Sequence, residues 1–133
     1  MRPAALPLAA LASLALPAAA DAQGRSDYAY GTRFFERVTV GDVEITPVGV
    51  LEDTRCPDPM LCFRRDALLV SAILWDRRGK REIVLRRDGL TPVPGGALLL
   101  TQGGTAPALN GATPLADYRL DIVFVRFPEP GGS

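Results

Sequence analysis

Apolar and polar residues alternate with a period of two in several short segments of this chain, and turn-forming residues separate the segments. The first two segments, residues 34–40 and 43–50, flank Gly41 and Asp42, an arrangement that predicts a β-hairpin. After Pro47 the apolar parity shifts by one residue. That shift indicates a β-bulge, or an edge position where no amide donor is needed.

The segment Ala67–Trp75 is almost continuously apolar on both parities. This pattern predicts a central strand that is covered on both faces. Residues 76–80 form a polar turn with a glycine available for a positive φ angle. The chain is then expected to return through a second strand, residues 81–87, with Ile83 and Leu85 facing inward.

The last third of the chain predicts two more strands. A short apolar run, residues 97–101, precedes a long surface connection over residues 102–116, and Tyr118–Phe127 is the last strong strand segment. No segment repeats apolar residues at the spacing of a helix. Short strands separated by turn residues predict an all-β fold, a small antiparallel β-sandwich or barrel-like variant of about six to eight strands.

The first 22 residues have the pattern of a cleaved secretory signal peptide. Arg2 is followed by an uncharged run rich in Ala and Leu, and small residues stand at Ala20 and Ala22. Cleavage after Ala22 is the first choice and after Ala20 the second. The strongest apolar stretch, residues 6–16, is about half of the roughly 20 residues that span a bilayer, so no transmembrane anchor is expected. Because no cysteine lies near the cut, we expect a periplasmic or secreted protein that is not a lipoprotein.

The rest of the chain is long enough for one domain. Residues 23–33 are polar and are predicted to form a flexible N-terminal segment, in which Tyr28 and Tyr30 could dock as a strand edge. Residues 34–128 form the predicted single β-sandwich domain, and residues 129–133 a flexible tail.

Composition excludes several classes of function. The chain has no histidine, which excludes Ser-His-Asp and Cys-His catalysis, His-ligated zinc and His-based pH switches. Its 15 basic residues balance 15 acidic ones, so there is no overall attraction to nucleic acid. The acidic residues around the cysteines also lack the spacing of a calcium loop. We expect no cofactor, no metal site and no nucleic-acid partner.

Two cysteines, Cys56 and Cys62, enclose a proline-rich loop. In an exported protein such a pair is most simply a structural disulfide, here clipping the connection between two strands. The chain-entropy contribution of so short a ring is roughly 2 kcal/mol. Asp53, Arg55 and Pro57 are predicted to organise the loop, because an aspartate can accept amide bonds and an arginine can fork to a carboxylate or to loop carbonyls.

One wider pattern combines this segment with the end of the chain: Asp53, Arg55, Cys56, Pro57 and Cys62, with a late Tyr-Arg-Leu strand that ends in Pro128 and Pro130. In these residues the chain resembles a group of small exported bacterial proteins with an Asp-Ser-Arg-Cys-Pro signature and a second cysteine. Thr54 replaces the serine of that group, and residues 63–65 depart from its Trp-Ala-Gly type of sequence. The resemblance implies a β-sandwich and no established biochemical activity.

The most uneven charge distribution lies between Arg64 and Asp88, where basic residues outnumber acidic ones. An exposed hairpin there could bind an anionic glycan, a lipid headgroup or an acidic protein surface. The alternative is a solvated turn that discourages edge pairing. The candidate residues for anion or partner binding are Arg77, Arg78, Lys80 and Arg81.

Two functions remain open from the sequence. The first is an exported, non-catalytic β-sandwich protein that serves as a binding or structural module of the cell envelope, with an envelope protein or an anionic envelope component as partner. No catalytic residue is assigned, because no nucleophile has an evident base. The alternative is a protease-inhibitor-like or enzyme-associated protein that presents the Cys56–Cys62 loop, with Arg55, Pro57 and Met60 exposed.

Overall fold

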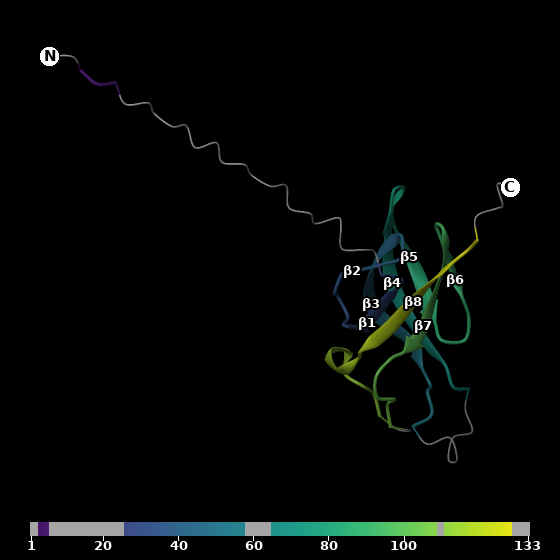
Figure 1. Cartoon of the computed structure of the whole chain (residues 1–133). Helices are drawn as coiled ribbons and strands as arrows, with labels where there is room; N and C mark the ends of the chain where they lie inside the picture. The colour runs from purple at the N-terminus through teal and green to yellow at the C-terminus, as the bar shows by residue number, and fades with distance from the viewer. Residues whose placement is uncertain (1–2, 6–25, 58–64, 109–110, 129–133) are drawn as a thin grey trace.

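The computed structural model describes residues 3–5, 26–57, 65–108 and 111–128. In these residues, eight strands form two antiparallel four-stranded sheets that share one hydrophobic core (Figure 1). The predicted all-β sandwich is confirmed. The strands are β1 (Tyr28–Thr32), β2 (Val38–Val40), β3 (Val43–Asp53), β4 (Leu68–Asp76), β5 (Gly79–Arg86), β6 (Thr91–Val93), β7 (Gly96–Gln102) and β8 (Leu120–Arg126), with a 3-10 helix, η2 (Leu115–Asp117), before β8.

The two sheets have the strand orders β1-β8-β7-β6 and β2-β3-β4-β5. Most pairs join strands that follow each other along the chain, as expected for antiparallel hairpins. The exception is β1, which pairs with the last strand, β8. Strand β1 also contacts β2, and β5 contacts β6 and β7. The two sheets therefore approach each other along both sides of the sandwich.

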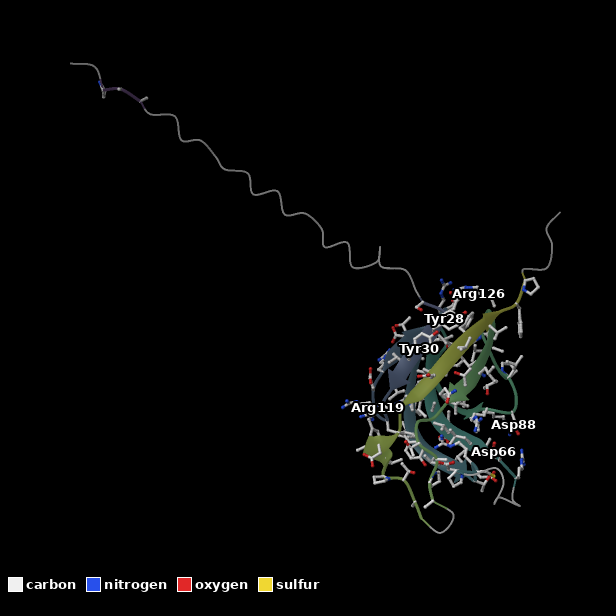
Figure 2. The ribbon with its side chains drawn as sticks, turned by 60° about the horizontal axis from the view of Figure 1, so that its bottom comes forward. Tyr28, Tyr30, Asp66, Asp88, Arg119 and Arg126 are labelled. Atoms are coloured by element: carbon white, nitrogen blue, oxygen red, sulfur yellow. The ribbon has the colours of Figure 1, made fainter. Side chains whose placement is uncertain are left out.

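The segment predicted to be a flexible N-terminal extension, residues 23–33, contains strand β1, so its described part belongs to the domain. Tyr28 and Tyr30 do dock as an edge, and their rings stack with centroids 5.8 Å apart. Figure 2 shows both tyrosines along the outside of the molecule, beside the yellow strand β8. The predicted first strand at residues 34–40 is shorter than expected, because Phe35 has a φ of 67° and the strand begins only after it.

Strand β3 continues through Pro47 as one strand of 11 residues. Its register against β4 shifts between Pro47 and Gly49, which confirms the predicted bulge. Strand β3 as a whole is an inner strand, between β2 and β4, but Pro47 lies beyond the part that pairs with β2. A proline is tolerated in this inner strand because β2, whose pairing with β3 starts at Val38 opposite Ile45, does not reach it.

Strand β4 is central in its sheet, but only one of its faces is fully covered. On the outer face Ile73 and Trp75 are half-buried, and the Ser71 hydroxyl donates to the Glu82 carboxylate. The expectation of cover on both faces is wrong, because the second sheet packs against the inner face alone. The residues of β4 buried on that inner face are Leu68, Val70, Ala72 and Leu74.

The core lies between the sheets and receives large aliphatic side chains from both. Ile83 and Leu85 face inward on β5, as expected from the sequence. Fully burying one such side chain stabilises the fold by about 1.5–3 kcal/mol, so this layer supplies the main driving force for folding. Its largest fully buried apolar members are Ile45, Leu68, Leu74, Leu85, Leu98, Leu100, Leu120 and Ile122.

The predicted signal peptide, residues 1–22, lies outside the described residues except for 3–5, and the predicted tail, 129–133, lies entirely outside them. Both assignments stay predictions. Among the described residues, none of the helical structure is long and apolar enough to span a membrane.

Candidate functional site

Two parts of the molecule collect the residues that the sequence singled out, and they lie at opposite ends of the sandwich. The segment after β3 that carries Cys56 lies at the lower end in Figure 1, and the β4–β5 and β6–β7 turns lie at the upper end.

At the lower end, Asp53 and Arg55 form a buried ion pair. Their side chains are 6% and 5% exposed. Arg55 Nε donates to Asp53 Oδ1 and Nη2 donates to Oδ2, both at 2.9 Å, so the guanidinium forks to both carboxylate oxygens. The backbone amide of Arg55 also donates to Asp53 Oδ1 at 3.3 Å. This local fork was predicted from the sequence. The remaining partners of the ion pair come from residues far along the chain.

The pair is completed from the region between β7 and β8. The Tyr118 hydroxyl donates to Asp53 Oδ2 at 2.6 Å. Arg55 Nη1 donates to the carbonyl of Gly104 at 2.8 Å, and Nη2 to that of Thr105 at 3.2 Å. These hydrogen bonds join the end of β3 in one sheet to the connection between β7 and β8 of the other. We name Asp53, Arg55 and Tyr118 the buried triad.

The buried triad changes the proton affinity of its members. Burial by itself raises the pKa of Asp53, but hydrogen bonds from Arg55 and Tyr118 and the charge of Arg55 outweigh it, and the pKa lies below its usual 3.8. Burial, together with the hydrogen bond to Asp53, raises the pKa of Tyr118 to about 12. Asp53 is thus held as a carboxylate and Tyr118 as a neutral donor. A fixed, solvent-excluded arrangement of this kind fits a structural role.

The lowered pKa of Asp53 predicts a loss of stability in acid. A carboxyl group whose pKa is lower in the fold contributes stability above its unfolded pKa, and this contribution is lost as the pH falls through the folded pKa. We expect the urea midpoint to fall steadily as the pH drops below about 4. Asp53→Asn should remove this component, whereas Asp117→Asn, an exposed change on η2, should keep it. Parallel pH profiles for wild type and Asp53→Asn would contradict the assignment.

The raised pKa of Tyr118 predicts a complementary loss in base. The unfolded phenol ionises near pH 10, whereas the folded one ionises near pH 12, so its contribution to stability is full below pH 10 and is lost as the pH rises through 12. Absorbance titration of the phenolate should show a late component that Tyr118→Phe removes. Tyr30→Phe is the matched control, because Tyr30 is 71% exposed. A late component that survives in Tyr118→Phe would assign it to another group.

The burial of Arg55 corrects one expectation. The loop-presenting alternative needed Arg55 on the surface, but its guanidinium is enclosed by the buried triad and the loop carbonyls. Pro57 is exposed, and the Cys56 amide donates to Asp66 Oδ1 at 3.2 Å. In Figure 2, Asp66 lies beside Asp88 at the lower end, where Arg87 and Arg65 respectively pair with them. Of the described residues expected on that loop surface, Pro57 is exposed and Arg55 is buried.

The described residues do not test the predicted disulfide, because Cys62 lies outside them, as does Met60. The pairing of Cys56 with Cys62 stays a prediction. We expect thiol labelling of the unfolded, unreduced protein to find no reactive thiol, and labelling after reduction to find two. Two thiols before reduction would show that the loop is not clipped. The Cys56→Ser variant controls for incomplete labelling, since one thiol must then appear.

At the upper end, the turns of both sheets surround an open groove with a volume of about 940 Å³. One wall comes from the β4–β5 hairpin, where Asp76 pairs with Gly79 and the two residues between them form the turn. Gly79 has a φ of +115°, a conformation that favours glycine. The groove is lined by Arg37, Asp42, Glu44, Trp75, Asp76, Arg77, Arg78, Arg81, Pro92, Val93, Pro94 and Gly95.

The acidic groups that line the groove are already engaged. Asp42 pairs with Arg126 at 3.0 Å, and Glu44 pairs with Arg37. Asp76 Oδ1 accepts the backbone amide of Arg78 at 2.7 Å. Asp42 and Glu44 are thus paired with arginines outside the hairpin. Asp76 keeps its charge, but the three hairpin arginines of the lining, Arg77, Arg78 and Arg81, outnumber it.

Three arginines of the groove are exposed and have no acidic partner in the described part of the chain. No carboxylate there lies within 4.0 Å of the guanidinium groups of Arg77, Arg78 or Arg81. Three of the four hairpin residues singled out from the sequence thus share one wall. Lys80, the fourth, lines a smaller adjoining hollow of about 290 Å³. We name Arg77, Arg78 and Arg81 the arginine wall.

Trp75 is part of the groove lining beside the arginine wall, and three contacts hold its ring in place. Its Nε1 donates to Thr46 Oγ1 at 3.3 Å. The Arg37 guanidinium lies over its ring, 4.1 Å from the centroid, and Lys80 Nζ lies at 5.5 Å. Such cation–π contacts hold both cations near the ring. Arg37 and the proline-rich β6–β7 turn were not singled out from the sequence, because their proximity depends on how the strands pair.

No group of three or more His, Cys, Asp or Glu side chains suited to a metal ion occurs among the described residues. The upper end offers guanidinium groups for electrostatic and hydrogen-bonding recognition, next to an apolar turn. Comparison with protein-family models, with curated proteins and with solved structures finds no match to this chain.

Proposed function

We propose that this protein is an exported, non-catalytic binding module of the cell envelope that holds an anionic component in the groove at the upper end of the sandwich. The observation that carries the proposal is the arginine wall. Its three guanidinium groups line a groove without acidic partners in the described part of the chain, although the whole chain has no net charge.

The positive charge of the arginine wall is larger than the fold of the hairpin requires. Exposed charges discourage edge pairing, and β5 already carries exposed Lys80 next to the wall and exposed Arg86 at its other end. Arginine presents a planar fork that matches carboxylate, sulfate and phosphate groups. A wall of such forks in a concave place therefore favours anion recognition over a purely solvating role.

Two features of the sequence support the export of this module. The signal-like first 22 residues support export, and the resemblance to small exported bacterial proteins points the same way. The loop-presenting alternative loses Arg55 as a recognition residue, because this side chain is buried. The groove is thus the better candidate for the contact with a partner.

The test is retention of the purified exported protein by the envelope fraction of the cells that make it. We expect wild type to sediment with the envelope at low salt and to be released as the salt concentration rises, because screening weakens exposed charge interactions. A variant with Arg77→Ala, Arg78→Ala and Arg81→Ala should stay in the supernatant.

The matched control removes three positive charges elsewhere. Arg33, Arg86 and Arg87 are exposed and do not line the groove, and the triple alanine variant at these positions should sediment like wild type. Equal retention of both triple variants would overturn the groove as the binding site. Retention that depends instead on intact cysteines and on Pro57 would favour the loop-presenting alternative.

A further inference from the structure

We propose that the anionic ligand of the groove is a linear acidic polysaccharide, whose carboxylate or sulfate groups pair with the arginine wall while its sugar rings lie against the proline-rich β6–β7 turn. This inference rests on the proposed function and names the class of ligand for the same groove. Three features of the site lead to it: its size, the chemistry of its second wall and its concave shape.

The size of the groove favours several linked units over a single small anion. Its volume of about 940 Å³ lies near the upper end of the roughly 300–1,000 Å³ typical of sites for drug-sized molecules. The guanidinium groups come from successive places on the hairpin, two in the turn and one from Arg81, which pairs with Leu74 on β4. A chain with repeated negative charges can contact all three at once, and linked contacts raise the overall affinity.

The part of the lining that comes from β6 and the β6–β7 turn is apolar and carries few donors. It is formed by Pro92, Val93, Pro94 and Gly95. Both prolines lack a backbone amide hydrogen, and Val93 is already paired with Gly96. Such a surface can pack against the CH groups of a sugar ring. It cannot supply the alternating amide and carbonyl groups by which a peptide adds to a strand edge.

A bilayer surface fits the site less well than a polymer chain. Proteins that lie on a membrane insert exposed apolar or aromatic side chains between the lipids. Trp75 is the aromatic residue of the groove, but it is half-buried, bonded to Thr46 and covered by Arg37. The lining of the groove therefore offers no exposed aromatic anchor. Phe127, whose amide donates to the Gly95 carbonyl, is exposed beside the β6–β7 turn, and the vesicle probe tests whether it acts as one. An acidic polypeptide and an anionic membrane remain as measurable outcomes of the test.

The test uses the fluorescence of Trp75, the single tryptophan of the chain, as the reporter of binding to the full exported protein. The probes are monomeric galacturonate, galacturonate oligomers of increasing length, dextran sulfate, neutral dextran, polyglutamate and vesicles that contain an anionic phospholipid. We expect affinity for galacturonate to rise with oligomer length, by about 100-fold or more from monomer to long oligomer. Dextran sulfate should bind as well, and neutral dextran should not.

Variants connect the binding to the groove. Loss of one charge-assisted hydrogen bond weakens binding by about tenfold or more, so Arg78→Ala should be measurably weaker and the triple arginine-wall variant weaker by about 100-fold. Arg33→Ala/Arg86→Ala/Arg87→Ala should bind like wild type. Urea midpoints of all variants are measured alongside, and Arg78→Ala alone decides the result if the triple variant fails to fold.

Each remaining outcome overturns one of the two proposals. Binding of galacturonate that does not change with oligomer length would overturn the polymer ligand and keep the anion-binding groove. Binding of polyglutamate or vesicles, but not of the acidic polysaccharides, through the arginine wall would do the same. Absence of binding to every anionic probe at low salt would overturn the proposed function together with this inference.

Discussion

Replacing Arg55 with methionine is expected to lower the free energy of unfolding by about 3–5 kcal/mol, the cost of leaving one member of a buried ion pair without its partner. The Asp53 carboxylate would stay in an environment where it is 6% exposed, with only Tyr118 and backbone groups to solvate it. The carbonyls of Gly104 and Thr105 would lose their donors as well. Urea unfolding near pH 7 measures the change.

A double-mutant cycle separates the charge from the packing. In Asp53→Leu/Arg55→Met both charged groups are gone, and replacing a whole buried pair by apolar residues is often close to neutral. We expect the double variant to be more stable than Arg55→Met alone. The control is Arg119→Met, because Arg119 is only half-buried and bonds carbonyls of its own neighbourhood. A loss below about 1 kcal/mol in Arg55→Met would show that water reaches the site.

The second large effect is expected for Gly96→Ala, which should lower the free energy of unfolding by about 3 kcal/mol, the upper part of the range for overpacking a core. Gly96 begins β7 and pairs with Arg126 on β8. An added Cβ would overlap the backbone carbonyl oxygen of Val125 and would lie 3.1 Å from Phe124 Cζ. Because the obstacle is backbone within a paired strand, it cannot rotate away as a side chain would.

Gly49→Ala is the matched control for this prediction. Gly49 is also a strand glycine, at the bulge of β3, but a Cβ there would meet no atom within 4 Å. Its replacement should change stability by less than about 1 kcal/mol, the scale of the glycine-to-alanine difference in chain entropy. Thermal or urea unfolding of both variants makes the comparison. Equal effects at the two positions would indicate that chain entropy, and not the close approach of β7 and β8, decides the result.

The two ends of the sandwich differ in role: the buried triad stabilises the fold at the lower end, and the groove at the upper end is the proposed binding site. At the lower end, hydrogen bonds donated by Arg55 and Tyr118 connect the end of β3 to the loop between β7 and β8. At the upper end, the groove is bounded by turns whose side chains are exposed. Changes in the buried triad should therefore alter stability much more than ligand binding, and changes in the arginine wall should do the reverse.

The sequence was sufficient for the fold class because strand periodicity is local. Alternating apolar residues and recurring turn residues correctly placed β4, β5, β7 and β8, and the parity shift at Pro47 correctly indicated the bulge. Errors arose where pairing decided the outcome. Strand β1 was assigned to a flexible segment because its few residues reveal little by themselves, and its stability comes from β8, far away along the chain.

The candidate site divides in the same way. From the sequence, Asp53 and Arg55 could be expected to form a fork, because the two residues are close along the chain, and a basic hairpin tip could be expected from its composition. Tyr118 as the third member of the triad and the burial of Arg55 followed only from the packing of the two sheets. Trp75 belongs to the hairpin itself, on β4, whereas Arg37 and the Pro92–Pro94 turn meet the hairpin only because strand order brings these separate segments to one end.

By itself, then, the sequence determined most of the strands and turns and the two segments that hold the candidate functional residues. Each of these depends on residues within a few positions of one another. The tertiary structure alone decided which of these segments is enclosed and which is open. It buried Arg55 against Gly104 and Tyr118, and it left Arg78 exposed beside a groove. The physical reason is that burial and charge compensation depend on partners far along the chain, which are chosen when the two sheets pack.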